Sequence, residues 1–91
     1  MNKNELVAEV AEKASLDKKA ASAAVDATFE AIIGALKADQ EVRITGFGTF
    51  WVSQSAERQG RDPRTGNAIT IAASKAPKFR AGKPFKDSLN D

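Results

Sequence analysis

The chain has 91 residues, which suits one small domain with a modest buried core. It contains no Cys, His or Tyr, which excludes disulfides, thiolate or imidazole metal sites and the commonest nucleophile–base pairs of enzymes. The net charge of +2 conceals a segregation: residues 58–91 hold eight basic and three acidic side chains, whereas residues 1–57 hold six and nine, which favours a polyanionic partner over a merely solvated basic face.

Two amphipathic helices are predicted first. Asn2, with Glu5 three residues later, has the pattern of a helix N-cap, and apolar residues then recur at helical spacing for about three turns. Asp17 is a good N-cap for a second, longer helix with a single apolar stripe. Gly34 lies inside that helix, where glycine costs about 1 kcal/mol relative to alanine, and the sequence gives no reason for it. Joined by a short turn, the helices form a hairpin with one apolar face to bury.

The apolar period then changes to two, which predicts strands. Apolar and polar residues alternate on both sides of a tight Gly-Phe-Gly turn at residues 46–48. This alternation places Trp51 on the face away from the helices, towards solvent or packed against the base of the following ribbon. The side chains expected to face the helices are Val42, Ile44, Phe50 and Val52.

A long β-ribbon follows. Two β-like runs, residues 49–58 and 68–80, flank the turn-forming heptad Gly60–Gly66. At about ten residues per strand the ribbon reaches roughly 33 Å, so Pro63 at its tip has little to bury against in its own subunit. Pro77 limits the second run to an edge strand or a bend. The segment Gly82-Lys83-Pro84 then places a proline where a helix begins, and residues 85–89 are predicted to form a short closing helix.

The order α-α-β-β-β-α predicts an α+β fold, with a helical hairpin base, a three-stranded antiparallel sheet, a protruding β-ribbon arm and a short C-terminal helix. We expect one domain over residues 1–91: a helical base and start of the sheet (1–52), the arm (53–76), and the end of the sheet with the last helix (77–91). Residues 53–78 contribute only two large apolar side chains, both isoleucines. That segment cannot form a core alone, which favours a dimer or another partner that completes it.

Several short motifs then point to one family. Together, in this order and at this spacing, they resemble the HU/IHF family of bacterial nucleoid-associated DNA-binding proteins, and the HU branch in particular. The resemblance implies an intertwined homodimer whose helices form the base, whose sheets form a saddle and whose two arms enter the minor groove of DNA. The motifs are Met1–Leu6, Ala11–Ala14, Gly46–Phe50, Gly60–Gly66, Pro77–Phe79 and Gly82–Lys83.

The resemblance also implies roles for individual residues. Pro63 is expected to insert between base pairs and kink the duplex; HU and IHF are themselves among the proteins that define this wedge mechanism. The plain alternative is a turn proline, and Pro63 can satisfy both. No cofactor or metal is implied. The residues expected to contact DNA are Arg58, Arg61 and Arg64 on the arm and Lys75, Lys78, Arg80, Lys83 and Lys86 along the saddle and its flank, while Phe47, Phe50 and Phe79 are expected in the dimer core.

Four positions depart from the usual HU pattern. Around the base of the arm, where HU proteins usually carry basic residues, this chain has Ser53 and Ser55, with Gln59 further out. At the tip, Asp62 stands where the family usually has Asn. These changes predict fewer phosphate contacts and weaker DNA binding than in a typical member, with Arg64 compensating in part.

The expected function is architectural: binding duplex DNA with little sequence preference, bending it, and compacting or stabilising it, with a preference for nicked, gapped or bent sites. An IHF-like site-specific subunit is the alternative within the class, and a dimeric protein-interaction module is an improbable alternative outside it. An enzyme is the weakest option. No apolar run approaches the ~20 residues of a membrane span, so we expect a cytoplasmic, nucleoid-associated protein that forms homodimers or pairs with a paralogue.

Overall fold

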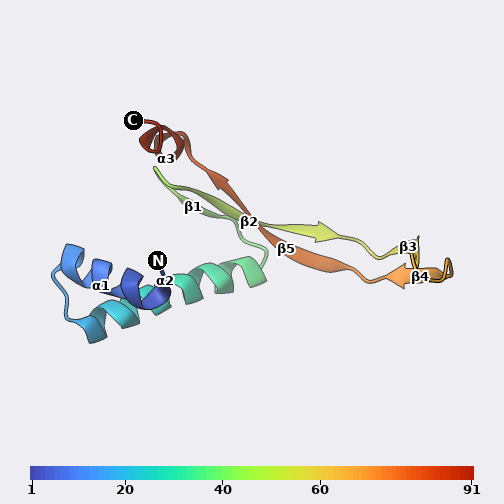
Figure 1. The fold of residues 1–91 in the computed structure, drawn as a ribbon, viewed down its shortest axis with the longest axis horizontal. Coiled ribbons are helices and arrows are strands. Elements are labelled where there is room, and N and C mark those ends of the chain that lie inside the picture. The colour runs from blue at the N-terminus through green and yellow to red at the C-terminus, as the bar shows by residue number, and fades with distance from the viewer.

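The computed structural model describes all residues, 1–91, and shows an elongated molecule (Figure 1). Its extents are 58 × 32 × 27 Å and its radius of gyration is 18.9 Å. A compact chain of this length has a radius of gyration of about 12 Å. The difference arises from a β-ribbon that leaves one end of the sheet, while the C-terminal helix lies at the other end.

The two predicted helices are confirmed, with the caps that the sequence indicated. Helix α1 spans Lys3–Ala14, and the side chain of Asn2 accepts a hydrogen bond of 2.9 Å from the backbone N–H of Glu5. Helix α2 spans Lys18–Lys37, and Asp17 accepts one of 2.7 Å from the N–H of Ala20. Each cap satisfies a backbone donor that the first helical turn leaves unpaired.

The hairpin buries only part of its apolar surface. Val7 of α1 packs with Ala21 and Val25 of α2, and these three side chains form the whole buried core of the chain. Helix α2 is eight residues longer than α1, so the apolar stripe on its second half is not covered by α1. There Phe29 is 47% exposed and Ile33 is 53% exposed. A single chain therefore leaves a large apolar helix face open to solvent.

The sheet has the antiparallel order β1-β2-β5, formed by β1 (Val42–Ile44), β2 (Gly48–Ser55) and β5 (Ser74–Ala81). The first position of β2, residue 48, is a glycine because no side chain fits there. An added Cβ would lie 2.5 Å from the carbonyl oxygen of Arg80 and 2.5 Å from the ring of Phe79. Pro77 lies on β5, an edge strand, as expected from its missing N–H. The short closing helix α3 spans Lys83–Ser88.

The prediction of two long, continuous strands for the ribbon is wrong in one respect, because each strand is interrupted. The ladder between β2 and β5 ends at the pair Ser55–Ser74, and a second ladder joins β3 (Arg58–Arg61) to β4 (Ala68–Ile71). The gap contains three alanines and one glutamate, residue types with low β-propensity that have no packing partners here. Three further steps along the first ladder lead to Arg58–Ile71, which is the first pair of the second ladder. One register therefore runs through the gap, with no bulge.

An aromatic cluster covers the face of the sheet opposite Trp51. Phe79 lies 4.7 Å from Phe50 and 5.3 Å from Phe47, measured between ring centroids. Phe85 of α3 completes the cluster by stacking on Phe47 at 4.9 Å, a contact that the sequence did not indicate. In the single chain Phe47 remains 42% exposed and Phe79 40% exposed. The cluster is thus the edge of a core that one chain does not close.

Candidate nucleic-acid interface

The outer face of the sheet, away from the aromatic cluster, is basic. Directly paired residues of neighbouring strands project to the same side of a sheet. Arg43, Thr49 and Arg80 form one such row across β1, β2 and β5, and Trp51 pairs with Lys78 in the adjacent row. Lys78 and Arg80 therefore share a face, as predicted. Their positive charges lie together on a surface that no helix of this chain covers.

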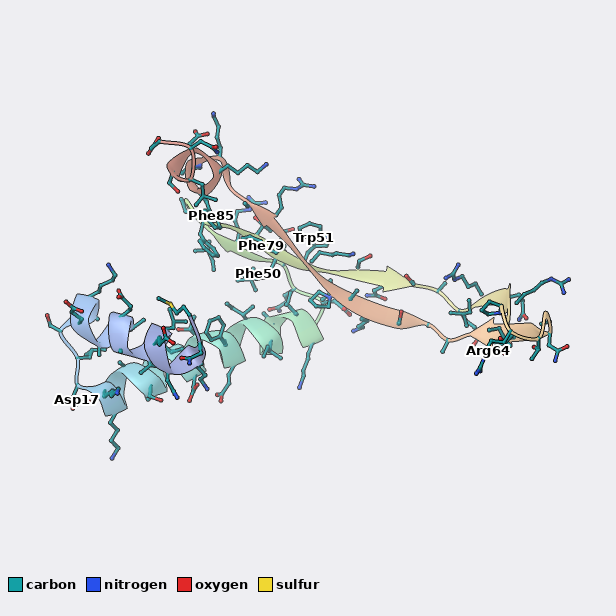
Figure 2. All side chains as sticks on the ribbon, in the orientation of Figure 1. Asp17, Phe50, Trp51, Arg64, Phe79 and Phe85 are labelled. Carbon is teal, nitrogen blue, oxygen red and sulfur yellow. The ribbon has the colours of Figure 1, made fainter.

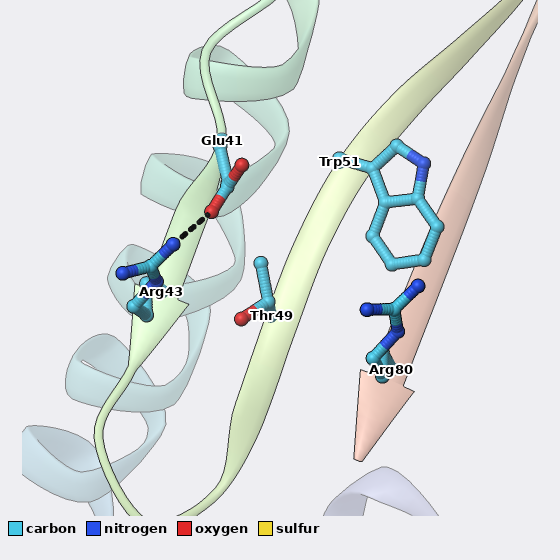
Figure 3. Close-up of a pocket in the computed structure, with 5 residues that line it drawn as sticks. All are labelled: Glu41, Arg43, Thr49, Trp51 and Arg80. Carbon is cyan, nitrogen blue, oxygen red and sulfur yellow. Dashed lines mark hydrogen bonds and ion pairs between the residues drawn. The ribbon is translucent and has the colours of Figure 1, made fainter. Parts of the chain in front are cut away.

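Trp51 lies among these charges. The guanidinium carbon of Arg80 lies 5.5 Å from the centroid of the Trp51 ring, within the range of a cation–π contact (Figure 3). The alternation predicted that Trp51 faces away from Phe50 and Val52, and the structure confirms it. The indole supports Arg80 from the side and leaves the guanidinium facing a shallow hollow on the outer face.

Arg43 belongs to the same face and was not among the predicted binding residues. It lines the hollow together with Arg80 and Thr49, and forms an ion pair of 3.0 Å with Glu41. The alternation of residues 42–44 already indicated that Arg43 points away from the helices. What the sequence did not provide was the pairing that puts Arg43 beside Thr49 and Arg80.

Lys75 does not lie on the basic face, which corrects the expectation that it lines the saddle with Lys78 and Arg80. It pairs with Gln54, one position out of phase with Lys78, and so projects to the helix side of the ribbon. There its ammonium group lies 2.9 Å from the carboxylate of Asp39 at the end of α2. A contact between Lys75 and DNA stays a prediction.

Helix α3 adds two lysines at the end of the sheet away from the arm. Lys83 donates to Asp87 one turn later at 3.2 Å, a pair exposed enough to contribute little stability. Lys86 makes no ion pair, and neither do Arg58 and Lys78. These three side chains are charged without an internal counterion.

The tip of the arm is an ordered turn. The N–H of Gly66, in the left-handed conformation with φ 75°, donates to the carbonyl of Asp62 at 2.7 Å. The carboxylate of Asp62 accepts from the N–H of Arg64 at 2.8 Å, and the guanidinium of Arg61 donates to the carbonyl of Gly66 at 3.0 Å. Pro63 stands exposed in this turn. Figure 2 places Arg64 at the end of the ribbon furthest from the helices.

Asp62 therefore has a role that the sequence did not reveal. Its side chain closes the turn by accepting a hydrogen bond from the backbone N–H two residues ahead, as Asp and Asn both do. Its charge also lies 3.8 Å from the Nε of Arg64. Part of the positive charge of the tip is thus neutralised within the arm itself.

Between the basic face and the tip, the same side of the ribbon is neutral or acidic. Following the continuous register outward, it presents Ser53 and Ser55, then Glu57 in the gap of the ladder, then Gln59, which donates to Thr70 at 3.4 Å. The three positions without the usual basic residue thus share one side of the ribbon. On this side the chain has two basic regions, one on the sheet and one at the tip, separated by a stretch without positive charge.

A fold with a helical base, a sheet with a basic outer face and a protruding ribbon defines a class of small DNA-binding proteins. The family model for bacterial DNA-binding proteins matches residues 1–90. The chain belongs to this family, and within it to the HU proteins.

Individual relatives are similar to this chain over nearly its whole length. DNA-binding protein HU-beta of Neisseria meningitidis is 55% identical over 89 residues, covering 98% of this chain and 100% of that one. DNA-binding protein HRm of Rhizobium meliloti is 54% identical over 90 residues, covering 99% and 100%. Among solved structures, an Anabaena HU–DNA cocrystal structure matches with a TM-score of 0.85 and 44% identity, covering 98% of this chain and 97% of that one. The names of the two curated relatives describe DNA-binding proteins, and the solved structure is of an HU protein with DNA.

The structure contains neither a membrane-length apolar helix nor a cluster of possible metal ligands. None of its helices is long and apolar enough to cross a bilayer. No three or more His, Cys, Asp or Glu side chains are grouped in a way that could hold a metal ion.

Proposed function

We propose that this chain is an architectural protein that binds duplex DNA with little sequence preference and bends it. One observation carries the proposal: a basic sheet face and a basic arm tip are joined by a ribbon that projects away from the body, in a fold matching an HU–DNA cocrystal structure at a TM-score of 0.85. The sheet face suits the phosphates of the duplex, and the arm has the reach to follow its surface. Compaction or stabilisation of DNA in the nucleoid follows from bending at many sites.

The acting species is a homodimer. The exposed apolar half of α2 and the half-exposed aromatic cluster are both surfaces that a second copy would cover. Two arms would then embrace the duplex from both sides. A heterodimer with a paralogue would use the same surfaces.

The arms bend DNA through the minor groove. Pro63 is exposed at the tip, and the hydrogen bonds of the turn hold it in place. Proline is rigid and apolar and has no N–H to satisfy, so it can replace part of a base-stacking contact as a wedge. Because the cost of the kink depends on how easily the DNA deforms, nicked, gapped or bent sites are preferred to intact duplex.

Affinity comes mainly from release of counterions. If about eight phosphates are neutralised per dimer, log K against log[salt] has a slope near −7. Titration at several salt concentrations by fluorescence anisotropy measures this slope. A flat salt response would rule the mechanism out, and equal affinity for nicked and intact duplex would count against bending.

The wedge is tested by Pro63→Ala, assayed by gel shift and by end-to-end fluorescence transfer on the same duplexes. We expect bending to be lost while much of the affinity remains, because the phosphate contacts of the arm are unchanged. Arg58→Ala is the matched comparison, since Arg58 makes no contact within the turn and its loss removes only charge. It should lower affinity and leave the bend. If neither change alters binding or bending, the arm does not act on DNA.

Binding to a preferred DNA site that competitor DNA cannot displace would instead favour a site-specific, IHF-like subunit.

A further inference from the structure

The end of helix α2 contains a residue in a conformation that favours glycine. Asp39 has φ 59°, in the left-handed region. The N–H of Gln40 donates a hydrogen bond of 2.9 Å to the carbonyl of Ala35. The N–H of Asp39 donates one of 3.0 Å to the carbonyl of Leu36. This pair of hydrogen bonds is the Schellman motif, whose left-handed position is usually occupied by glycine. An aspartate here is locally unfavourable, and its negative charge lies at the negative end of the helix dipole.

The side chain of Asp39 also makes two tertiary contacts. One of its carboxylate oxygens, Oδ1, accepts a hydrogen bond from the amide of Gln54 at 3.1 Å and forms an ion pair of 2.9 Å with the ammonium group of Lys75. Gln54 and Lys75 are direct cross-strand partners on the helix side of the ribbon, where β2 and β5 leave the sheet. A single oxygen at the end of α2 thus holds both strands of the arm at their base.

An apolar contact accompanies this bond. Beside Lys75, the side chains of Val52 and Pro77 from the ribbon and of Ile33 and Leu36 from α2 line one apolar hollow. Apolar packing has no directional preference, so it would tolerate a change in the angle between ribbon and helix. The hydrogen bond from Gln54 to Asp39 is directional and restricts that angle, and the ion pair with Lys75 adds attraction at the same oxygen.

We propose that Asp39 is a positioning residue for DNA bending: its carboxylate clamps the base of the arm to the end of α2 and sets the direction in which the arm leaves the body. The inference rests on the proposed function, because it assigns how the arms are aimed before they meet DNA. An arm aimed in advance loses less conformational freedom on binding, and all bound duplexes are bent in the same direction. The ion pair also neutralises part of the charge that Lys75 would bring to a phosphate.

Two substitutions at Asp39 separate the clamp from the fold. Asp39→Gly removes both contacts and places at the left-handed position the residue that suits it, so the melting temperature should be equal to or above that of the wild type. Asp39→Asn keeps an oxygen for Gln54 and loses the charge attraction to Lys75. Glu30→Gln is the matched control, because it removes one negative charge from the same helix at a residue without an ion pair.

Bending is measured by single-molecule fluorescence transfer on an end-labelled nicked duplex at saturating protein, where loss of affinity has no influence. We expect a broader distribution of bend angles for Asp39→Gly, an intermediate one for Asp39→Asn and the wild-type distribution for Glu30→Gln. In both Asp39 variants the freed Lys75 should steepen the salt slope by up to ~0.9 for each phosphate that it reaches, about two per dimer. Wild-type distributions and slopes for both Asp39 variants would overturn the proposal, as would effects equal to those of Glu30→Gln.

A measurement without DNA separates failure of the clamp from failure of the proposed function. In the free protein, ¹⁵N relaxation should show residues 58–71 moving more independently of α2 in Asp39→Gly than in the wild type. If the wild type does not bend DNA but the variant loosens the arm, the proposed function fails and the clamp stands. If the arm mobility is unchanged, the clamp is refuted whatever the DNA shows.

Discussion

At the scale of single residues, the site depends on which side of the ribbon each side chain occupies. Lys75 and Lys78 are three positions apart on β5, so they lie on opposite sides, and only Lys78 joins Arg80 on the basic face. Asp62 shows the same dependence on local geometry. Its carboxylate accepts a hydrogen bond from the backbone of the turn, and it also carries a negative charge. These two roles have opposite consequences for DNA binding, so they have to be tested separately.

Asp62→Asn makes that separation. Asn retains an oxygen that can accept from the N–H of Arg64, so the turn should persist, while the negative charge disappears and Arg64 is released from its pair. We expect DNA affinity to rise about threefold per tip, corresponding to ~0.5–1 kcal/mol for an exposed charge pair. Fluorescence anisotropy at fixed salt measures the gain.

Asp62→Ala is the control, because it removes the charge and the acceptor together. It should gain less affinity than Asp62→Asn, since the turn loses the bond that orders it. If the wild type and Asp62→Asn bind DNA with equal affinity, the negative charge of Asp62 does not weaken DNA binding by the arm tip.

At the scale of elements, the helices could be predicted and the continuity of the strands could not. Asn2 and Asp17 mark helix starts through local hydrogen bonds that the sequence fully specifies. The side of the sheet that Trp51 occupies follows from simple alternation. The gap at residues 56–57 and 72–73 depends on an absence of packing partners, and no local pattern reports that absence.

The candidate binding residues divide in the same way. Charge segregation pointed to the basic half of the chain, the two β-like runs predicted the arm, and the resemblance made Pro63 a candidate wedge. Arg43 was missed because it lies in the acidic half and joins the basic face only through cross-strand pairing. The roles of Asp39 and Asp62 could not be predicted, since each depends on a backbone turn and a side-chain contact that exist only in the folded chain.

Two glycine-to-alanine substitutions should have opposite effects on the stability of the chain. Gly48→Ala should destabilise the chain by about 1–3 kcal/mol, because the added Cβ would collide with backbone and ring atoms of β5. Gly34→Ala should stabilise it by about 1 kcal/mol, because an added Cβ in α2 has nothing within 4 Å. Chemical denaturation followed by circular dichroism measures both. A loss of stability for Gly34→Ala would mean that a surface from outside the chain, such as a second copy, lies against that part of α2.

At the scale of the whole molecule, the chain is an incomplete core with a long appendage. Only four of its 91 residues are buried, three of them at one end of the hairpin. A chain of this size with so little buried surface has a small margin of stability. The apolar second half of α2 and the aromatic cluster are the surfaces where a second copy would supply the missing contacts.

The melting temperature should therefore rise with protein concentration, because dimerisation stabilises the folded chain by mass action. Calorimetry over a hundredfold range of concentration, with sedimentation to record the mass, tests this. Phe79→Ala should lower the melting temperature at every concentration, since it removes the ring that contacts Phe47, Phe50 and Phe85. A melting temperature independent of concentration, with a monomeric mass, would contradict the dimer.

The unbroken register of the ribbon restricts how such an arm can change in length. One extra residue in a single strand near Glu57 would turn every later side chain of that strand to the opposite side, so Gln59 and Arg61 would leave the side that they now share with Ser53 and Ser55. One extra residue in each strand would keep each cross-strand pair together, but it would turn all the outer pairs to the opposite side. Two extra residues in each strand would keep both the pairing and the side, and would extend the reach by about 6.6 Å. Arms in this fold should therefore lengthen and shorten by two residues in each strand, which makes this step the unit by which evolution or design can adjust the span of DNA that a protein holds.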